Sequence, residues 1–285
     1  MELTQGQAPA DDQKPKVLVV IAHPDDEVFV SGTLCMCTDR GFPIKLVCAT
    51  DGEGGDRALV FRSSGLSLGE IRRRELLLSA AMLGIQEVFF LGQPDVGEPY
   101  VPAPGGWDQT RTIDELGGII ERFSPDLILT HGPVGGYGHP AHQLTYRCVA
   151  AASEATSFRG SLFSFCGQVP KSFFSWHFDQ PADVLVDVRD FLARRVASLS
   201  YHQTQLNYFT QPFFPHTLRK WLSALFGFVF LWTEAGRKRI PIGTPSRFFA
   251  RFPLEGLVLQ KQPPDGTAHF FKEHFGHDDC VRIDR

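Results

Sequence analysis

The segment Ala22-His23-Pro24-Asp25-Asp26-Glu27 places one imidazole and three carboxylic acids side by side in the chain. It directly follows the apolar run 17–21, which is typical of a buried parallel strand. Open α/β folds bind their ligands at the carboxyl edge of such strands. Clustered carboxylates repel one another and lose hydration when they are buried, so the segment predicts a divalent cation that would stabilise them.

A second polar segment follows another apolar run much later in the chain. The run 126–130 precedes a loop that ends in Gly-His-Pro-Ala-His, residues 138–142. Pro140 suits the first position of a helix, because its missing N–H would be unpaired there. His139 then lies at the helix start and His142 in the first turn, and residues three apart share a helix face. Because both segments follow parallel strands, we expect them to meet at one edge of the sheet.

Two histidines and an aspartate form a suitable ligand set for catalytic zinc, which usually has three protein ligands and an open position for water. Zinc lowers the pKa of bound water to about 7, and a carboxylate outside the ligand set can take its proton. Asp25 and Asp26 could divide these two tasks. Spacing alone assigns neither the ligand within this pair nor the ligand within the pair His139 and His142. Iron(II) accepts the same donors as zinc.

The elements that must position these residues alternate between strands and helices. Apolar runs predict strands at 16–22, 44–50, 88–91, 126–130, 184–188 and 254–260. Helical periodicity predicts helices at 26–39, 70–83, 112–123, 140–157 and 190–206. The serial strand–helix units of the first half predict an α/β fold, with a Rossmann-like, mainly parallel sheet and helices on both faces.

Length and composition restrict the class of protein. The chain has 285 residues, of which 43% are hydrophobic, and this suits one large α/β domain. We expect a disordered tail at 1–15, a single domain at 16–260 and a C-terminal extension at 261–285. A formal net charge of −4 gives no basis for nucleic-acid binding. Six cysteines without a CxxC pair favour reduced thiols in a cytoplasmic protein over a disulfide framework.

The longest apolar run, Trp221–Trp232, is too short to span a bilayer as a helix. We therefore expect no transmembrane segment. The basic residues Arg237, Lys238 and Arg239 follow this run, and the combination is compatible with weak peripheral contact with acidic lipid head groups. The sequence is also compatible with association into a homo-oligomer.

Several motifs occur in the order found in the LmbE/PIG-L family of zinc-dependent N-deacetylases, which the chain resembles. The segment AHPDDE at 22–27 is similar to the first family motif, and GGYGHPAH at 135–142 is similar to the second, which is usually GHPDH. Weaker similarities occur at Thr50-Asp51-Gly52-Glu53, Arg72 with Glu75, Leu91-Gly92 with Pro94-Asp95, and His202 with Thr204-Gln205. The resemblance covers residues 16–206 and implies an LmbE-like fold.

The resemblance also implies a role for each matching residue of the first motif. His23 and Asp26, together with His142, would be the zinc ligands. Asp25 would be the general base that activates the attacking water. For Glu27 the resemblance implies no role, and we interpret it as a residue outside the chemistry that supports the helix start or the groups behind the ligands.

Other matching residues would act on the substrate. His139, assisted by Tyr137, would stabilise the oxyanion of the tetrahedral intermediate. Arg72 and Asp95 would contact the substrate. Ala141 replaces the aspartate that is usual in the second motif. We therefore predict weaker electrostatic stabilisation of protonated His139. His131 lies outside these motifs, and its place at the end of its strand is compatible with a position behind the ligands.

The predicted function is that of a metal-dependent amidohydrolase that removes an acetyl group from an N-acetylglucosamine-type conjugate, a small molecule. One alternative keeps the site and changes the bond to another amide or acyl group on a glycolipid, glycopeptide or thiol conjugate. A second is a metal- or sugar-binding homologue without turnover, for which Ala141 is the only support. A third is a two-metal phosphoester hydrolase that uses Asp51, Glu53 and Asp56. Helix capping alone would explain one aspartate of the first motif.

Overall fold

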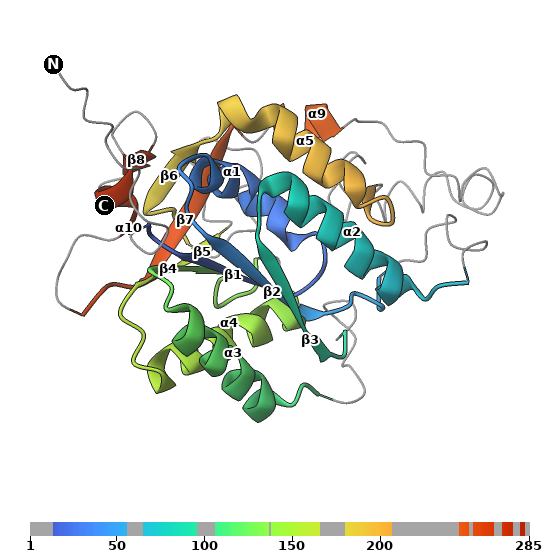
Figure 1. Ribbon diagram of the computed structural model, residues 1–285, viewed down its shortest axis with the longest axis horizontal. Helices are drawn as coiled ribbons and strands as arrows, with labels where there is room; N and C mark the ends of the chain where they lie inside the picture. Colours follow the sequence, from blue (N-terminus) through green and yellow to red (C-terminus); the bar gives the residue numbers. More distant parts are fainter. Residues whose placement is uncertain are drawn as a thin grey trace, which may run out of the picture.

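The centre of the computed structural model is a sheet with eight strands among the described residues, in the order β3-β2-β1-β4-β5-β7-β6-β8 (Figure 1). The structure describes residues 14–55, 65–95, 106–136, 138–165, 180–206, 245–250, 253–264, 270–275 and 280–282. The strands are β1 (Val17–Ile21), β2 (Ile44–Thr50), β3 (Glu87–Gln93), β4 (Leu127–Thr130), β5 (Ser161–Phe165), β6 (Val184–Asp187), β7 (Leu254–Lys261) and β8 (Cys280–Arg282). Neighbours from β3 to β5 pair in parallel, whereas β7 is antiparallel to β5 and β6, and β8 is antiparallel to β6. The predicted mainly parallel α/β sheet is confirmed.

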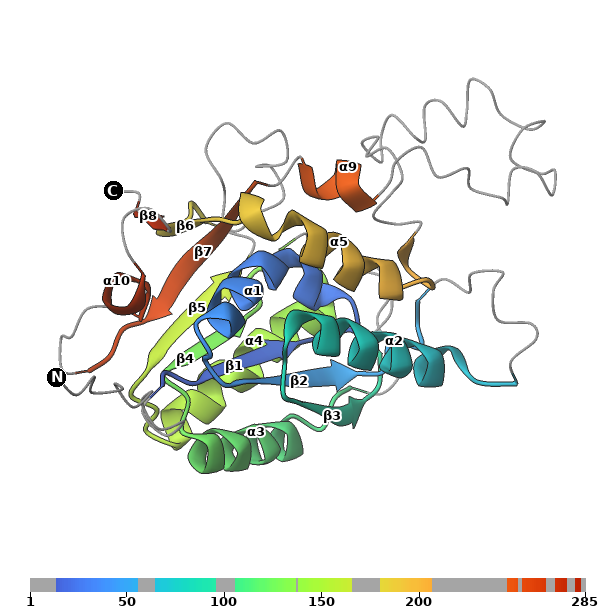
Figure 2. The same ribbon diagram turned by 45° about the horizontal axis from the view of Figure 1, so that its top comes forward.

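Helices cover both faces of this sheet (Figures 1 and 2). They are η2 (Asp26–Val30), α1 (Ser31–Asp39), α2 (Leu68–Leu83), α3 (Gln109–Phe123), α4 (Pro140–Ala155), η5 (Arg189–Phe191), α5 (Leu192–Tyr201), α9 (Pro245–Ala250) and α10 (Phe270–His274). Figure 2 shows α1 and α2 against one face with α5 over them, and α3 and α4 against the other. Alternate residues of β1 enter the two apolar clusters, Val17 and Val19 on the side of α1 and Leu18 and Val20 on the side of α4. This two-sided burial explains why the strand is an unbroken apolar run.

The elements predicted before residue 157 are present, with one difference at the start of the first helix. The expected helix at 26–39 is a short 3₁₀ helix, η2, followed by α1. The helix expected at 190–206 ends at Tyr201. Strand β5 was not predicted, because Ser161 and Ser164 interrupt its apolar residues, although all five of its residues are buried. It lies between β4 and β7, deep inside the sheet.

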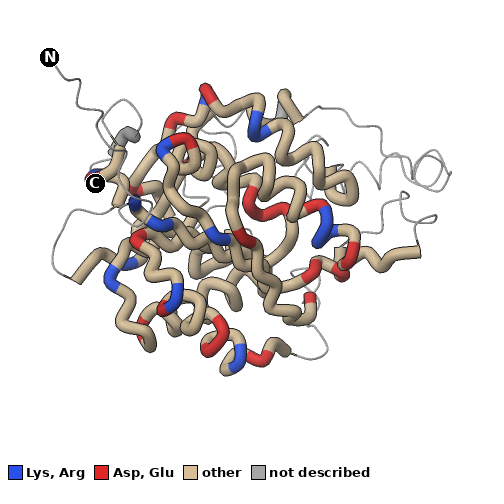
Figure 3. The backbone as a smooth tube through the Cα atoms, viewed as in Figure 1, with Lys and Arg blue, Asp and Glu red and all other residues tan. Residues whose placement is uncertain are grey.

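The segment Trp221–Trp232, the basic residues 237–239 and Tyr137 lie outside the described residues. Within the part of the chain that the structure describes, no helix has the length and apolar character needed to cross a bilayer. Figure 3 shows Lys and Arg positions interspersed with Asp and Glu positions over this part. The boundaries of the tail, the domain and the C-terminal extension stay a prediction.

A buried carboxylate joins β7 to the start of α1. Glu255 Oε1 accepts a hydrogen bond from the backbone N–H of Gly32 at 2.8 Å. Its Oε2 accepts from the N–H of Thr33 at 2.8 Å and from the Thr33 hydroxyl at 2.7 Å. The guanidinium of Arg195 lies 3.3 Å from Oε1. Strand β7, through Glu255, therefore supplies an acceptor for N–H groups that the first turn of α1 would leave without one. This contact fixes the helix that follows the first motif.

We expect Glu255→Ala to lower the free energy of unfolding by about 3 kcal/mol, because it leaves Arg195 charged and buried and removes the acceptor at the helix start. Urea denaturation would measure this loss. The matched control is Glu87→Ala, which removes a half-exposed carboxylate paired with Lys45 and should change the unfolding free energy by less than about 0.5 kcal/mol. A loss below about 1 kcal/mol for the Glu255 variant would contradict the proposed link.

Candidate metal centre

The first motif leaves the carboxyl end of β1 through an unusual backbone turn. Asp25 has a φ of 124° and a ψ of −14°, a conformation that residues with a side chain rarely adopt. The N–H of Asp26 donates to the His23 carbonyl at 3.2 Å, and the N–H of Val28 donates to the Asp25 carbonyl at 3.3 Å. The side chain of Asp25 forms no capping hydrogen bond to η2. Capping therefore does not explain this aspartate.

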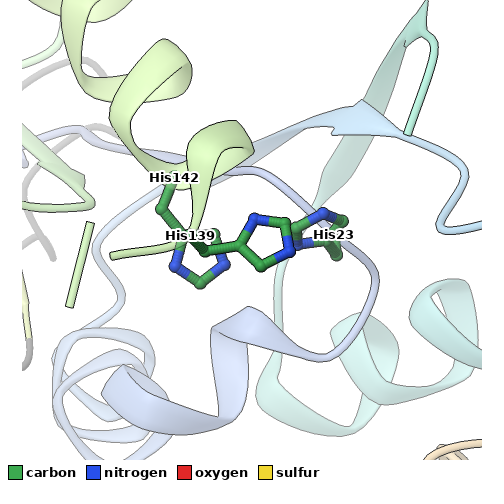
Figure 4. A group of neighbouring side chains, drawn as sticks. All are labelled: His23, His139 and His142. Carbon is green, nitrogen blue, oxygen red and sulfur yellow. The ribbon is translucent and has the colours of Figure 1, made fainter. Parts of the chain in front are cut away.

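Three histidines meet where β1 and α4 come together (Figure 4). His139 is the N-cap of α4 and Pro140 occupies its first turn, as predicted. The ring of His23 lies 4.7 Å from the ring of His139 and 5.3 Å from that of His142, and the latter two rings are 4.8 Å apart. All three residues are buried, and one donor nitrogen of each lies within 4.8 Å of the others. The expected meeting of the two loops is confirmed.

Asp26 connects this group to a fourth imidazole. Its Oδ1 lies 3.4 Å from His142 Nε2, while its Oδ2 lies 3.2 Å from His131 Nε2 and 3.4 Å from His23 Nδ1. The ring of His131 stacks on that of His142 at 3.9 Å. Asp26, His131 and His142 thus form a second group that could hold a metal ion, and it shares His142 with the first. The motif comparison missed His131 as a possible ligand, although its place directly after β4 was a usable signal.

The charges of this cluster suit a cation. Burial alone would raise the pKa of Asp26, but His142 and His131 hold this pKa well below its usual range, so the carboxylate is ionised. Burial alone would lower the pKa of His23, but hydrogen bonds with Asp26 and Asp95 raise it to about 9. Imidazole nitrogens and an ionised carboxylate are established ligand types for zinc and related metals.

His139 differs from His23 in its proton. Burial, followed by the nearby rings of His23 and His142, lowers the pKa of His139 to about 3. Its Nδ1 accepts a hydrogen bond from the N–H of Ala141 at 3.2 Å. The neutral ring must therefore carry its hydrogen on Nε2. Ala141 itself is completely buried in the apolar cluster of β1 and α4, so the methyl group packs where an aspartate would need a polar partner.

Asp25 lies next to Asp26 in the chain, and the pKa of its carboxyl is unusual. Burial raises the pKa of its carboxyl to about 7, although the Arg72 guanidinium, 3.3 Å away, opposes the rise. Arg72 is itself buried and donates to the carbonyls of Pro24 and Gly52, each at 2.7 Å. A Cβ at residue 52 would lie 2.4 Å from Arg72 Nη1, so the close approach of this loop requires glycine. Arg72 therefore holds the loops after β1 and β2 together, and its contact with substrate stays a prediction.

Asp95 brings the loop after β3 to the same place. Its Oδ1 accepts from His23 Nε2 at 3.2 Å, and its Oδ2 accepts from the N–H of Gly54 at 3.0 Å. Burial alone would raise the pKa of Asp95, but the hydrogen bond with His23 helps to lower it to about 2. Four loops, which follow β1 to β4, thus contribute residues to one edge of the sheet.

The described acids proposed for a second metal, Asp51 and Glu53, belong to neither candidate metal group within the described ranges. Asp51 accepts from Arg73 at 3.1 Å. Asp56 is outside those ranges. A bridged pair of metal ions of the kind that phosphoester hydrolases use thus gains no support from the described part of the chain.

Comparison with known proteins adds a family and a fold. A family model described as "PIG-L: GlcNAc-PI de-N-acetylase" matches residues 18–153. The chain is 30% identical over 233 residues to a 1D-myo-inositol 2-acetamido-2-deoxy-alpha-D-glucopyranoside deacetylase of Mycobacterium sp. (strain KMS), which covers 68% of this chain and 75% of the relative. The region that the family model matches contains Asp25, Asp26 and the four clustered histidines.

Solved structures are similar in fold at low sequence identity. The 4-carboxy-2-hydroxymuconate hydratase GalB from Pseudomonas putida KT2440 has a TM-score of 0.57 at 18% identity, over 90% of this chain and 99% of that one. A zinc-inhibited form of teicoplanin deacetylase Orf2 has a TM-score of 0.52 at 14% identity, over 69% of this chain and 87% of that one. These likenesses concern the fold alone, because a hydratase and a deacetylase share it.

We expect metal binding to release a proton, because His23 has a raised pKa of about 9 and an imidazole binds metal only in its neutral form. Below that pKa the proton competes with the metal, so the apparent affinity should rise about tenfold between pH 6.5 and 7.5. Titration of chelator-treated protein with zinc, by calorimetry in two buffers, would measure both the affinity and the released proton.

The control for this measurement is His23→Gln, in which the proton release should disappear together with most of the affinity. An affinity for zinc that is independent of pH in the unsubstituted protein would contradict the assignment of His23 as a ligand.

Proposed function

Because the chain belongs to the PIG-L family, we propose that it is a hydrolase that removes the acetyl group from an N-acetylglucosamine-type sugar conjugate. The observation that carries the proposal is that buried Asp26 lies 3.4 Å from a ring nitrogen of both His23 and His142, next to Asp25, whose pKa is about 7. Each of the two candidate metal groups contains two of the three residues His23, Asp26 and His142. Hydrolysis of an unactivated amide requires a group of metal ligands beside a side chain that can accept a proton. The mycobacterial relative, a deacetylase of an acetamido sugar by its name, supports the substrate class.

We propose zinc as the metal, with His23, Asp26 and His142 as its ligands. Two imidazoles and a carboxylate leave a fourth position open, and His131 and His139 then remain outside the ligand set. When bound, zinc would polarise the acetamide carbonyl and make water a stronger nucleophile. Iron(II) accepts the same donors and is the alternative metal.

Asp25 has the proton-transfer role in this proposal. A carboxyl group with a pKa of about 7 can take a proton from the attacking water at neutral pH and return it to the leaving amine. The neutral His139 is the weaker candidate for the second step, because its pKa of about 3 means that it holds no second proton at neutral pH. Asp25 therefore serves as base and then as acid.

His139 has the role of stabilising negative charge. Its Nδ1 accepts from Ala141, so its hydrogen is on Nε2, from which it would donate to the carbonyl oxygen as charge develops there. Removing one such donor costs roughly 3–4 kcal/mol of transition-state stabilisation. Tyr137 would assist as a second donor, and Arg72 and Asp95 would border the sugar.

We also propose that the protein works in a reducing compartment, the cytoplasm. Cys35, Cys37, Cys48 and Cys148 are buried thiols. Buried thiols support a reducing location, in which disulfides do not form.

The proposed activity is tested by acetate release from N-acetylglucosamine conjugates with several aglycones. We expect release by the zinc-loaded protein, loss after chelator treatment and recovery when zinc is added back. A parallel series with longer acyl groups tests whether the bond is an acetamide or another amide. No release from any conjugate by protein with one bound zinc would contradict the proposed function and favour a binding protein without turnover.

Asp25→Asn should lower kcat by about 10²- to 10⁴-fold, because an amide cannot take the proton of water. Zinc content should be unchanged, since Asp25 is not a proposed ligand. Asp51→Asn, in the loop after β2, is the control and should keep kcat within about twofold. If the Asp25 variant retains the full rate, Asp25 is not the base of this reaction.

A further inference from the structure

The backbone of Asp25 is strained in a way that needs an explanation. Among the described residues, Ser124 and Ser157 also have a positive φ without being glycine, but both lie at 52° in the ordinary left-handed region. Asp25 lies at 124°, well outside that region. Conformations of this kind persist only where the surroundings hold them. The residue under strain is the proposed base, so the groups that hold it determine where its carboxylate points.

Glu27 holds the Asp25 peptide from inside the protein. Its Oε2 accepts the backbone N–H of Asp25 at 3.1 Å. Its Oε1 accepts from the Ser79 hydroxyl at 2.6 Å and from His202 Nε2 at 2.5 Å. Glu27 is completely buried and belongs to neither candidate metal group of the described chain. The Glu27 carboxylate thus accepts three hydrogen bonds, and none of them comes from a residue of the two candidate metal groups.

The partners of Glu27 come from distant elements. Ser79 lies on α2, on the same face as Arg72, whose guanidinium contacts the side chain of Asp25. His202 is the C-cap of α5 and is completely buried. Burial alone would lower the pKa of His202, but the neighbouring Glu27 raises it. The peptide between Pro24 and Asp25 is therefore held from two sides, at its carbonyl by Arg72 and at its N–H by Glu27, and Arg72 also contacts the Asp25 side chain.

We propose that Glu27 is a positioning residue that holds the strained turn at Asp25 and thereby aims the Asp25 carboxylate at the attacking water, with His202 and Ser79 fixing Glu27. The proposal rests on the proposed function for its effect on rate, but its structural part stands alone. It also explains why an acid follows the two aspartates of the motif without entering the chemistry.

The chain offers a matched comparison in Glu75. This residue is another buried carboxylate, one helical turn from Ser79, and it accepts from the N–H of Thr204 at 2.9 Å and from the Thr204 hydroxyl at 2.6 Å. It therefore anchors the segment that follows His202 but, by these bonds, does not hold the peptide of Asp25. Replacing it by glutamine should disturb packing to a similar degree without releasing the proposed base.

The first test compares crystal structures of Glu27→Gln and Glu75→Gln. A glutamine has one acceptor oxygen, so it cannot accept from Asp25 on one side and from both Ser79 and His202 on the other. We expect Asp25 to leave the conformation near φ 124° only in the Glu27 variant. Asp25 unchanged in that variant would overturn the proposal. This readout needs no substrate, so it decides the point even if the proposed activity is absent.

The second test is kinetic and uses the zinc-loaded full chain. Glu27→Gln should lower kcat about 10- to 100-fold while KM and zinc content stay near those of the unsubstituted protein, and Glu75→Gln should keep kcat within about threefold. In an Asp25→Asn background, Glu27→Gln should cause no further loss, because the base that it positions is already gone. An equal loss in both backgrounds would overturn the proposal.

A pair of variants at His202 keeps the proposal testable if Glu27→Gln does not fold. The amide of His202→Gln can still donate to Glu27, whereas His202→Leu cannot. We expect the glutamine variant to retain most of kcat and the leucine variant to lose about tenfold. Equal rates for the two variants would contradict the proposal that His202 fixes Glu27 and, through it, Asp25.

Discussion

The structure depends on one carboxylate that three imidazoles share. Asp26 lies within 3.4 Å of nitrogens from His23, His131 and His142. These residues come from the loop after β1, the end of β4 and the first turn of α4, so one buried charge determines how three elements meet. A buried charge without such partners would be costly. The fold can therefore tolerate Asp26 only when the whole edge is assembled, and a cation would relieve the same constraint.

The sheet explains why this polar edge is possible. Apolar side chains fill both faces, with β1 contributing alternately to the two clusters. At the carboxyl edge the strands end and loops take over. There, backbone groups of Pro24, Gly52 and Gly54 bond directly to the side chains of Arg72 and Asp95. The site is thus made of both side chains and the backbone of glycine-containing loops.

Much of this could be predicted from the sequence, because it depends on local pattern and on one topological rule. Apolar runs located β1 to β4, and the parallel arrangement brought His23 to His139 and His142. The rest depends on contacts that no local pattern encodes. The serines of β5 masked a buried strand. The positive φ of Asp25 follows from its neighbours in space, since the residue is not glycine. The bond between Glu27 and His202 spans 175 positions of the chain. The replacement at Ala141 was visible, but its apolar surroundings were not.

The place of β7 in the sheet has a consequence for how the molecule comes into being. This strand lies between β5 and β6, although it follows both in the chain, and it carries Glu255 to the start of α1. On the ribosome, β6 would emerge well before the strand with which it pairs. The edge formed by β1 to β4 could assemble early, while the helix behind the first motif would wait for its acceptor. Biosynthesis would thus pass through a species with an open sheet edge, of the kind that chaperones recognise.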